Sequence, residues 1–229
     1  MDDNTSNTRG VVRWIAKMMV LCAIFGLALF LSAGTLGWGA AWLYLGLYVA
    51  QQVALVLVLP PDLLAERAST KADTKRWDRL LVGLGALWLP LAIYVVAGLD
   101  HRNGWTGTSL AVQAIALVVV VLGIVISSWG MASNRYFSGT VRIQTDRGHQ
   151  VASGGAYRYM RHPGYAGGIL HHLAVPLLLG SWWALIPGLL GAGVLVVRTA
   201  LEDRTLHQEL PGYADYAQRT RYRLLPGVW

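Results

Sequence analysis

The stretch Leu110–Met131 reads LAVQAIALVVVVLGIVISSWGM and contains no Asp, Glu, Lys or Arg. A helix of about 20 apolar residues crosses a hydrocarbon core about 30 Å thick, so this stretch is long enough to span a bilayer. Three other charge-free stretches precede it, namely Met18–Leu36, Trp38–Leu59 and Leu80–Leu99. The sequence therefore predicts an all-α, polytopic membrane helix bundle.

The last apolar region, Tyr165–Leu201, is less regular than the first four. Gly180-Ser181 interrupts it, and it contains Pro176 and Pro187. We interpret it as two shorter helices packed as a hairpin, which gives six spans. Five spans with one re-entrant or tilted segment is the alternative.

The positive charges are distributed unevenly over the connections between these stretches. Of the 19 Lys and Arg residues, only Arg102 falls in a connection on the outer side of this topology. Because Lys and Arg concentrate in short cytoplasmic loops, both termini and the two long polar connections are predicted to be cytoplasmic, in an inner membrane. This topology accounts for the net charge of +7, so nucleic acid is not expected as a partner.

The chain changes character near residue 133. Residues 1–133 are predicted to form a transmembrane scaffold of four helices, with a short amphipathic surface helix in the connection Pro60–Arg79. Residues 134–229 contain the polar stretch Asn134–Pro163, the helical hairpin and a C-terminal amphipathic helix. Because Asn134–Pro163 contains aromatic and alternating apolar residues, we expect it to be ordered against the bundle.

Two clusters of ionisable residues flank the hairpin. Arg161 and His162 precede it, and Arg198, Glu202 and Asp203 follow. Both clusters adjoin cytoplasmic helix ends, so they are predicted to meet in one pocket there.

The second cluster points to function more than to stability. Arg198 and Glu202 are four residues apart and share a helix face, but such a pair contributes only about 0.2–0.5 kcal/mol. A charged residue at the centre of a membrane helix costs about 2.5–3.5 kcal/mol, and less near its end. The weak pairing does not offset that cost. No set of Cys, His and Glu has metal-ligand spacing, so no metal is expected.

The run Gly155–Gly167, which reads GAYRYMRHPGYAG, resembles the signature of the isoprenylcysteine carboxyl methyltransferase family. The second part of that signature is matched by Arg198, Glu202-Asp203, Leu206, Gly212-Tyr213, Tyr216 and Pro226. The resemblance covers roughly Asn134–Trp229. The chain departs from the family pattern at Ala156, where Pro is frequent, and at Asp203, where Glu is frequent.

The resemblance implies S-adenosyl-L-methionine as the methyl donor, bound in a cytoplasmic pocket formed by the C-terminal half. The implied cofactor-binding residues are His162, Tyr165, Tyr159, Arg161, Glu202 and Asp203. The implied catalytic residues are Arg198, Glu202 and His162.

The acceptor expected from the resemblance is lipid-like or small and apolar, and it would be reached from the lipid bilayer. Carboxyl O-methylation is the first expectation. Phospholipid N-methylation and small-thiol S-methylation, which occur in the same superfamily, are alternatives. A transporter or receptor without enzymatic activity is an alternative from a different class.

Overall fold

The computed structural model describes residues 3–229, with side chains described from residue 7 onward. The described residues form helices and turns, and no strand occurs among them. The elements are α1 (Asp3–Ala33), α2 (Gly39–Val58), α3 (Pro61–Ala68), α4 (Arg76–Gly83), η1 (Leu84–Trp88), α5 (Leu89–Asn103), α6 (Leu110–Ala132), η2 (Thr145–Arg147), η3 (Gly155–Arg158), α7 (Pro163–Leu178), α8 (Leu185–Glu209) and α9 (Tyr213–Arg219).

Five helices in the described chain are long and apolar enough to cross a membrane. They are Asn7–Ala33, Gly39–Val58, Arg76–Asn103, Leu110–Ala132 and Leu185–Glu209. The predicted all-α membrane bundle is thus confirmed.

The helix α7 is the short segment of the bundle. It has 16 residues, fewer than the about 20 that a full crossing needs. Pro176 lies inside its last turn, and Gly180 follows with φ +86°, so the chain turns back toward α8. Tyr165–Leu201 thus forms the expected hairpin of α7 and α8, but only α8 has the length of a span, so five helices and not six meet that criterion in the described chain.

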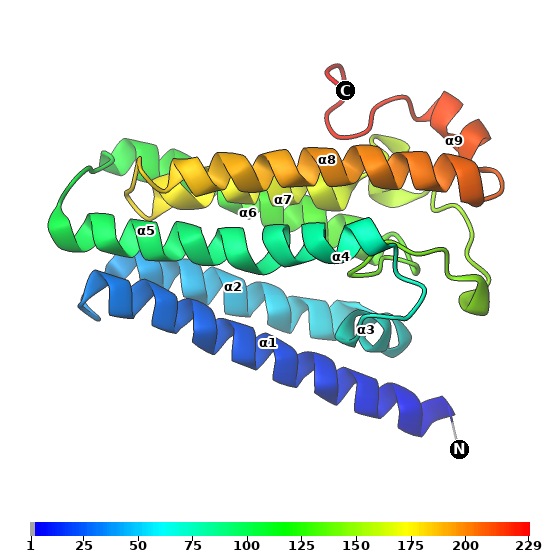
Figure 1. Cartoon of the computed structure of the whole chain (residues 1–229), viewed down its shortest axis with the longest axis horizontal. Coiled ribbons are helices and arrows are strands. Elements are labelled where there is room, and N and C mark those ends of the chain that lie inside the picture. Colours follow the sequence, from blue (N-terminus) through cyan, green and yellow to red (C-terminus); the bar gives the residue numbers. More distant parts are fainter. Residues whose placement is uncertain (1–2) are drawn as a thin grey trace.

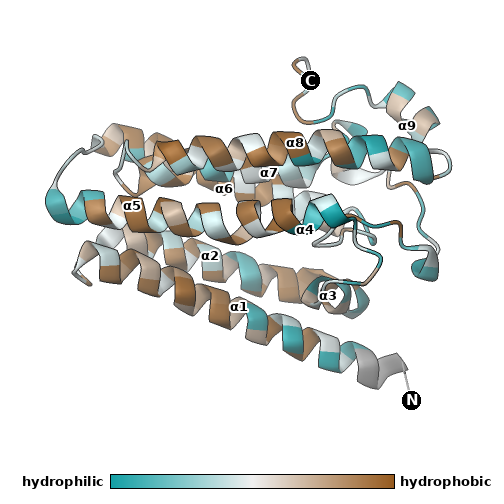
Figure 2. Cartoon of the chain, viewed as in Figure 1, coloured by the Kyte–Doolittle hydropathy of each residue, from teal (hydrophilic) through white to brown (hydrophobic). Residues whose placement is uncertain are grey.

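Several of the shorter elements collect at one end of the bundle (Figure 1). The start of α1, the C-terminus, α3, α9 and the segment between α6 and α7 lie there, whereas the α5–α6 and α7–α8 connections lie at the opposite end. Hydrophilic residues mark this end, and apolar residues cover most of the helix lengths (Figure 2). The start of α1 and the C-terminus thus share one side, and the assignment of that side to the cytoplasm stays a prediction.

Small residues allow α6 and α7 to pack closely. A Cβ on Gly167 would lie 2.4 Å from the Gly123 carbonyl oxygen, and one on Gly130 would lie 2.8 Å from Pro163 Cγ. Side chains larger than hydrogen would therefore push these helices apart. The close contact joins the predicted N-terminal scaffold to the helix that begins with the His-Pro motif.

The helix expected from Leu80 begins earlier, at Arg76, and continues through the π-helical turn η1 into α5. A π-helical turn changes the regular hydrogen-bond pattern of an α-helix. Here the Gly85 carbonyl oxygen lies 3.1 Å from His172 Nε2 of α7. The turn thereby contributes to the contact between the two halves of the chain.

The segment between α6 and α7 packs against α3 and α4, as its composition predicts. Arg142 is buried and contacts Glu66 of α3, Asp73 and Asp146. Although burial opposes its charged form, the hydrogen bonds that Arg142 donates to these three carboxylates raise its pKa above the usual value. The ion cluster fixes this segment over the polar end of the bundle.

Candidate functional site

A cavity of about 440 Å³ lies beneath the segment that joins α6 to α7. Side chains from α1, α2, α3, α7 and α8 line it, together with the α4–η1 helix and Tyr213 and Tyr216. Five of the predicted site residues line this cavity: Arg161, His162, Tyr165, Arg198 and Glu202. The fold therefore brings the two ionisable clusters to one place.

His162 is held at the start of α7 by the C-terminal segment. Pro163 occupies the first turn of the helix, where its missing N–H leaves no bond unmade. The backbone N–H of His162 donates to the Arg223 carbonyl at 2.9 Å, and its Nε2 lies 3.2 Å from Asp203 Oδ1. With Nε2–H donating to this carboxylate, Nδ1 is the nitrogen left to meet a ligand.

Asp203 is the centre of an ion cluster and does not line the cavity. Its two oxygens accept hydrogen bonds from Arg161, Arg223 and Tyr213 at 2.8–3.1 Å. Burial, and then the charge of Asp203, raise the pKa of Tyr213 well above its usual range, so the hydroxyl stays protonated. The predicted cofactor contact of Asp203 is not supported, because these partners already occupy both oxygens.

Arg161 contributes to the same cluster. It binds both oxygens of Asp203 and also donates from Nη1 to the carbonyls of Thr220 and Arg221. It borders the cavity, but these bonds hold the C-terminal segment against α7 and α8.

Tyr159 lies outside the cavity. Its side chain is 58% exposed, and its ring lies 5.9 Å from that of Trp129. The predicted cofactor contact of Tyr159 is therefore not supported by its position. The turn at η3 places Ala156 and Tyr157, but not Tyr159, in the interior.

Arg198 is anchored by a residue far away in the sequence. Its Nε donates to Asp78 Oδ1 at 2.6 Å, and its Nη2 donates to Asp78 Oδ2 and to the Gly139 carbonyl. Asp78 is fully buried and also accepts from the backbone N–H of Val141 at 2.6 Å. Nη1 makes no hydrogen bond within the described chain, which leaves a donor for a ligand.

Glu202 lies one helical turn beyond Arg198 on α8 and lines the same cavity. Its Oε2 accepts a hydrogen bond from the Tyr165 hydroxyl, and the Tyr165 ring lies 5.1 Å from the guanidinium carbon of Arg198. Oε1 accepts no hydrogen bond in the described chain. The site thus combines one carboxylate oxygen and one guanidinium nitrogen that are available to a ligand.

Two residues of the site were not identified from the sequence, namely Arg67, which lines the cavity, and Asp78, which binds Arg198. Asp78 and Arg67 lie in the connection before the third span, where each reads as an ordinary interfacial charge. Neither belongs to a recognisable motif, and Asp78 is 120 residues from its partner Arg198. An acidic residue two positions before an apolar stretch is the only local signal for Asp78.

A second cavity of about 210 Å³ extends the first one into the bundle. The two share Leu21, Gln51, Ala86 and Gly168 as lining residues. The rest of its lining is largely aromatic and apolar and includes Phe25, Tyr48 and Tyr94, and His171 also borders it. Of the two adjacent histidines, His172 borders the cavity of about 440 Å³ and His171 borders this deeper one.

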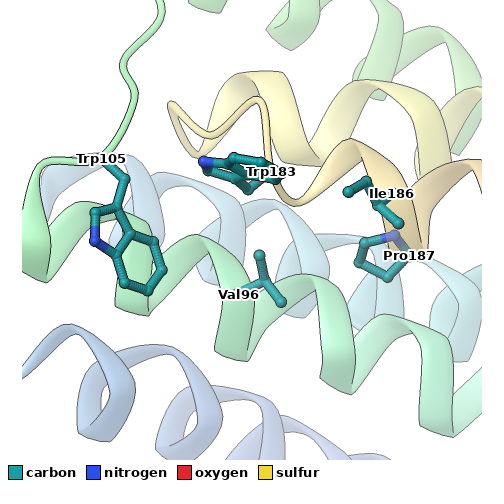
Figure 3. Close-up of a pocket in the computed structure, with 5 residues that line it drawn as sticks. All are labelled: Val96, Trp105, Trp183, Ile186 and Pro187. Atoms are coloured by element: carbon teal, nitrogen blue, oxygen red, sulfur yellow. The ribbon is translucent and has the colours of Figure 1, made fainter.

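A larger hollow of about 590 Å³ lies toward the opposite end of the bundle (Figure 3). It is lined by Val96, Trp105, Trp183, Ile186 and Pro187, none of which is ionisable or nucleophilic. Trp105 and Trp183 are more than half exposed, as is typical of aromatic side chains at a membrane interface. Despite its size, this groove offers no group that could carry out chemistry.

Comparisons with known proteins match the region that holds the motifs. Residues 114–208 match the family model described as the isoprenylcysteine carboxyl methyltransferase (ICMT) family. The proteins named "Probable protein-S-isoprenylcysteine O-methyltransferase" of Oryza sativa subsp. indica and subsp. japonica are each 33% identical to this chain over 69 residues. The alignment covers 30% of this chain and 36% of each relative. Residues 114–208 of the chain are therefore similar to the isoprenylcysteine carboxyl methyltransferase family.

Proposed function

We propose that this protein is an integral membrane methyltransferase that uses S-adenosylmethionine. The observation that carries the proposal is the meeting of His162 and Tyr165 of α7 with Arg198 and Glu202 of α8 at one cavity. These residues lie within the region that matches the family. The volume of about 440 Å³ is within the range of about 300–1,000 Å³ found for small-molecule sites.

The residues of the cavity fit this cofactor. S-adenosylmethionine has a sulfonium, an ammonium and a carboxylate, and its net charge is positive. Glu202 offers a carboxylate oxygen, and the rings of Tyr165, Tyr213 and Tyr216 offer faces that attract cations. When bound, the cofactor would supply a methyl group on a sulfonium that is already an activated leaving group.

The chain itself would position the reactants and exclude water. Glu202 would hold a positive part of the cofactor, and Arg198 would orient the acceptor through Nη1, because Asp78 fixes its other nitrogens. If the acceptor is an amine or a thiol, His162 Nδ1 is the candidate general base. A carboxylate acceptor would need no base.

An apolar chain on the acceptor is supported by the deeper cavity. A prenyl or acyl chain could extend from the polar site past Leu21 and Ala86 toward Phe25. The names of the rice relatives favour O-methylation of an isoprenylcysteine carboxyl group. N-methylation of a phospholipid and S-methylation of a thiol remain the alternatives for the same site.

The cavity would open to the cytoplasm in an inner membrane. This orientation is supported by the concentration of Lys and Arg at the end that contains the start of α1 and the C-terminus. The cofactor would then enter from the cytoplasm, while the acceptor enters laterally from the bilayer.

The test is methyl transfer from radiolabelled S-adenosylmethionine to prenylcysteine, phospholipid amines and simple thiols. Glu202→Gln should lower the rate at least about tenfold, because a charge-assisted hydrogen bond is worth about 1.5–3 kcal/mol. The matched control is Glu209→Gln, since Glu209 lies on the same helix but pairs with Lys75 away from the cavity.

Full activity of the Glu202 variant would refute the site. Calorimetry with the unmodified protein tests the class of function. A complete lack of heat with millimolar S-adenosylmethionine would instead favour a transporter or receptor.

A further inference from the structure

Most cations at the cavity are neutralised by the fold. Arg142, Arg161 and Arg198 pair with Glu66, Asp203 and Asp78 at N···O distances of 2.9, 2.8 and 2.6 Å. Lys17 and Arg67 also line the cavity, but neither has a carboxylate partner among residues 7–229. The positive charge on the α1 and α3 side is therefore left without a counterion from the described side chains.

Arg67 also lacks hydrogen-bond partners for its guanidinium group. Its Nε is buried and has no hydrogen-bond partner in the described chain. Nη1 donates only to the Phe137 carbonyl at 3.3 Å, and the guanidinium carbon lies 5.2 Å from the centre of the Phe137 ring. A buried guanidinium group with an unused donor is unfavourable unless a ligand supplies the acceptor.

The electrostatic surroundings of Arg67 are unfavourable for a cation. Burial, and then the charge of Arg198, lower the pKa of Arg67 to about 10. The group still has its proton at neutral pH. Arg67 thus stays charged while it faces further positive charge across the cavity.

This unpaired charge lies beside the apolar part of the cavity. Lys17 is on the face of α1 that includes Trp14 and Leu21, because residues three and four positions apart are neighbours on a helix. Both of these apolar residues line the cavity, and Leu21 also lines its deeper extension. A ligand that matches this side has an anionic group attached to an apolar chain.

We propose that Arg67 and Lys17 form a binding subsite for the anionic group, a carboxylate or a phosphate, of an amphiphilic methyl acceptor. The subsite rests on the proposed methyltransferase function and adds the charge of the acceptor to it. Both residues lie outside the matched region 114–208, although they line the same cavity as Arg198 and Glu202. The free carboxylate of the cofactor is the competing occupant.

The experiment measures binding of three fluorescent amphiphiles that have the same alkyl chain and a carboxylate, a phosphate or an uncharged hydroxyl head. The purified full-length protein is used in nanodiscs of uncharged lipid, in parallel with calorimetric binding of S-adenosylmethionine. Arg67→Gln should raise the Kd of one or both anionic probes by about ten- to hundredfold, which is the change expected from the loss of one hydrogen bond to a charged group. The hydroxyl probe and the cofactor should bind as before. The anionic head whose binding is weakened more shows whether the subsite prefers a carboxylate or a phosphate.

Arg204→Gln is the matched control, because Arg204 is an exposed cation of α8 that does not line the cavity. If the Arg67 variant does not fold, Lys17→Gln, which changes an exposed side chain at the edge of the cavity, provides the same comparison with a smaller loss. Without ligand, Arg67→Gln should also melt at the same or a higher temperature, since it removes an unpaired buried charge.

Three results would overturn the subsite. The first is equal weakening of the hydroxyl and anionic probes. The second is weaker cofactor binding with unchanged amphiphile binding, which would assign the anion to the cofactor. The third is unchanged binding of every probe. Because wild-type cofactor binding and methyl transfer are measured separately, none of these results depends on the proposed methyltransferase activity being wrong.

Discussion

The two sides of the cavity differ in how their charges are satisfied. On the C-terminal side, Asp203 binds Arg161, Arg223 and Tyr213, so α7, α8 and α9 are joined before any ligand arrives. On the N-terminal side, Lys17 and Arg67 have no carboxylate partner among residues 7–229. The comparison teaches that one side is preformed and that the other has charge left for a ligand to balance.

The strongest test of the preformed side is Asp203→Ala. Removing this buried carboxylate leaves Arg161 without its partner and should lower the free energy of unfolding by about 3–5 kcal/mol. Thermal unfolding in detergent measures the loss. Asp215→Ala is the control, because Asp215 is an exposed acid on α9, and equal melting of the two variants would show that the cluster is not stabilising.

Asp78→Asn tests the carboxylate of α4 that anchors Arg198 of α8. It should lower the free energy of unfolding by about 1.5–3 kcal/mol, because it weakens charge-assisted bonds to Arg198. Methyl transfer should slow while cofactor binding is retained, since Asp78 positions Arg198. Asp73→Asn is the comparison, as Asp73 is half exposed and shares Arg142 with two other carboxylates; a similar effect of both changes would argue against a special role for Asp78.

Gly167→Ala tests the packing that joins the two sides. The added methyl group would lie 2.4 Å from the Gly123 carbonyl oxygen, so the free energy of unfolding should fall by about 1–3 kcal/mol. Gly193→Ala on α8 meets nothing within 4 Å and should be neutral or slightly stabilising. Chemical unfolding of both variants checks the difference, and a neutral Gly167 variant would mean that α6 and α7 can separate without cost.

The smallest expected effect is the pH dependence contributed by His149 in the segment above the cavity. Burial, and then the charges of Arg142 and Arg147, lower the pKa of His149 from 6.5 to about 4. In the unfolded chain His149 becomes protonated below about pH 6.5, whereas in the folded chain it becomes protonated only near pH 4. The free energy of unfolding therefore falls as the pH is lowered from 6.5 to 4. Because the ring is partly exposed, we expect a loss of about 1 kcal/mol.

His149→Gln should remove that part of the pH dependence. Melting temperatures of both proteins between pH 7 and pH 4 provide the check. If the melting temperatures of the variant and the original protein fall equally with pH, His149 does not contribute to the pH dependence of stability.

The sequence by itself determined the parts of this protein that depend on local properties. Apolar length predicted the spans, and the uneven Lys and Arg distribution placed the start of α1 and the C-terminus on the same side. The motif residues on either flank of Tyr165–Leu201 predicted one shared site, and His162 and Glu202 do line the same cavity. These features follow from hydrophobic burial and from the geometry of a hairpin, which act over short stretches of chain.

Only the tertiary structure decided which charges are paired. Asp203, expected at the cofactor, instead holds Arg161 and Arg223, and Asp78 holds Arg198 across 120 residues of sequence. Arg67 has no such partner in the described chain, although its sequence context resembles that of any basic loop residue. The energy of an ion pair depends on distance and burial, and helix packing sets both, so local sequence does not reveal them.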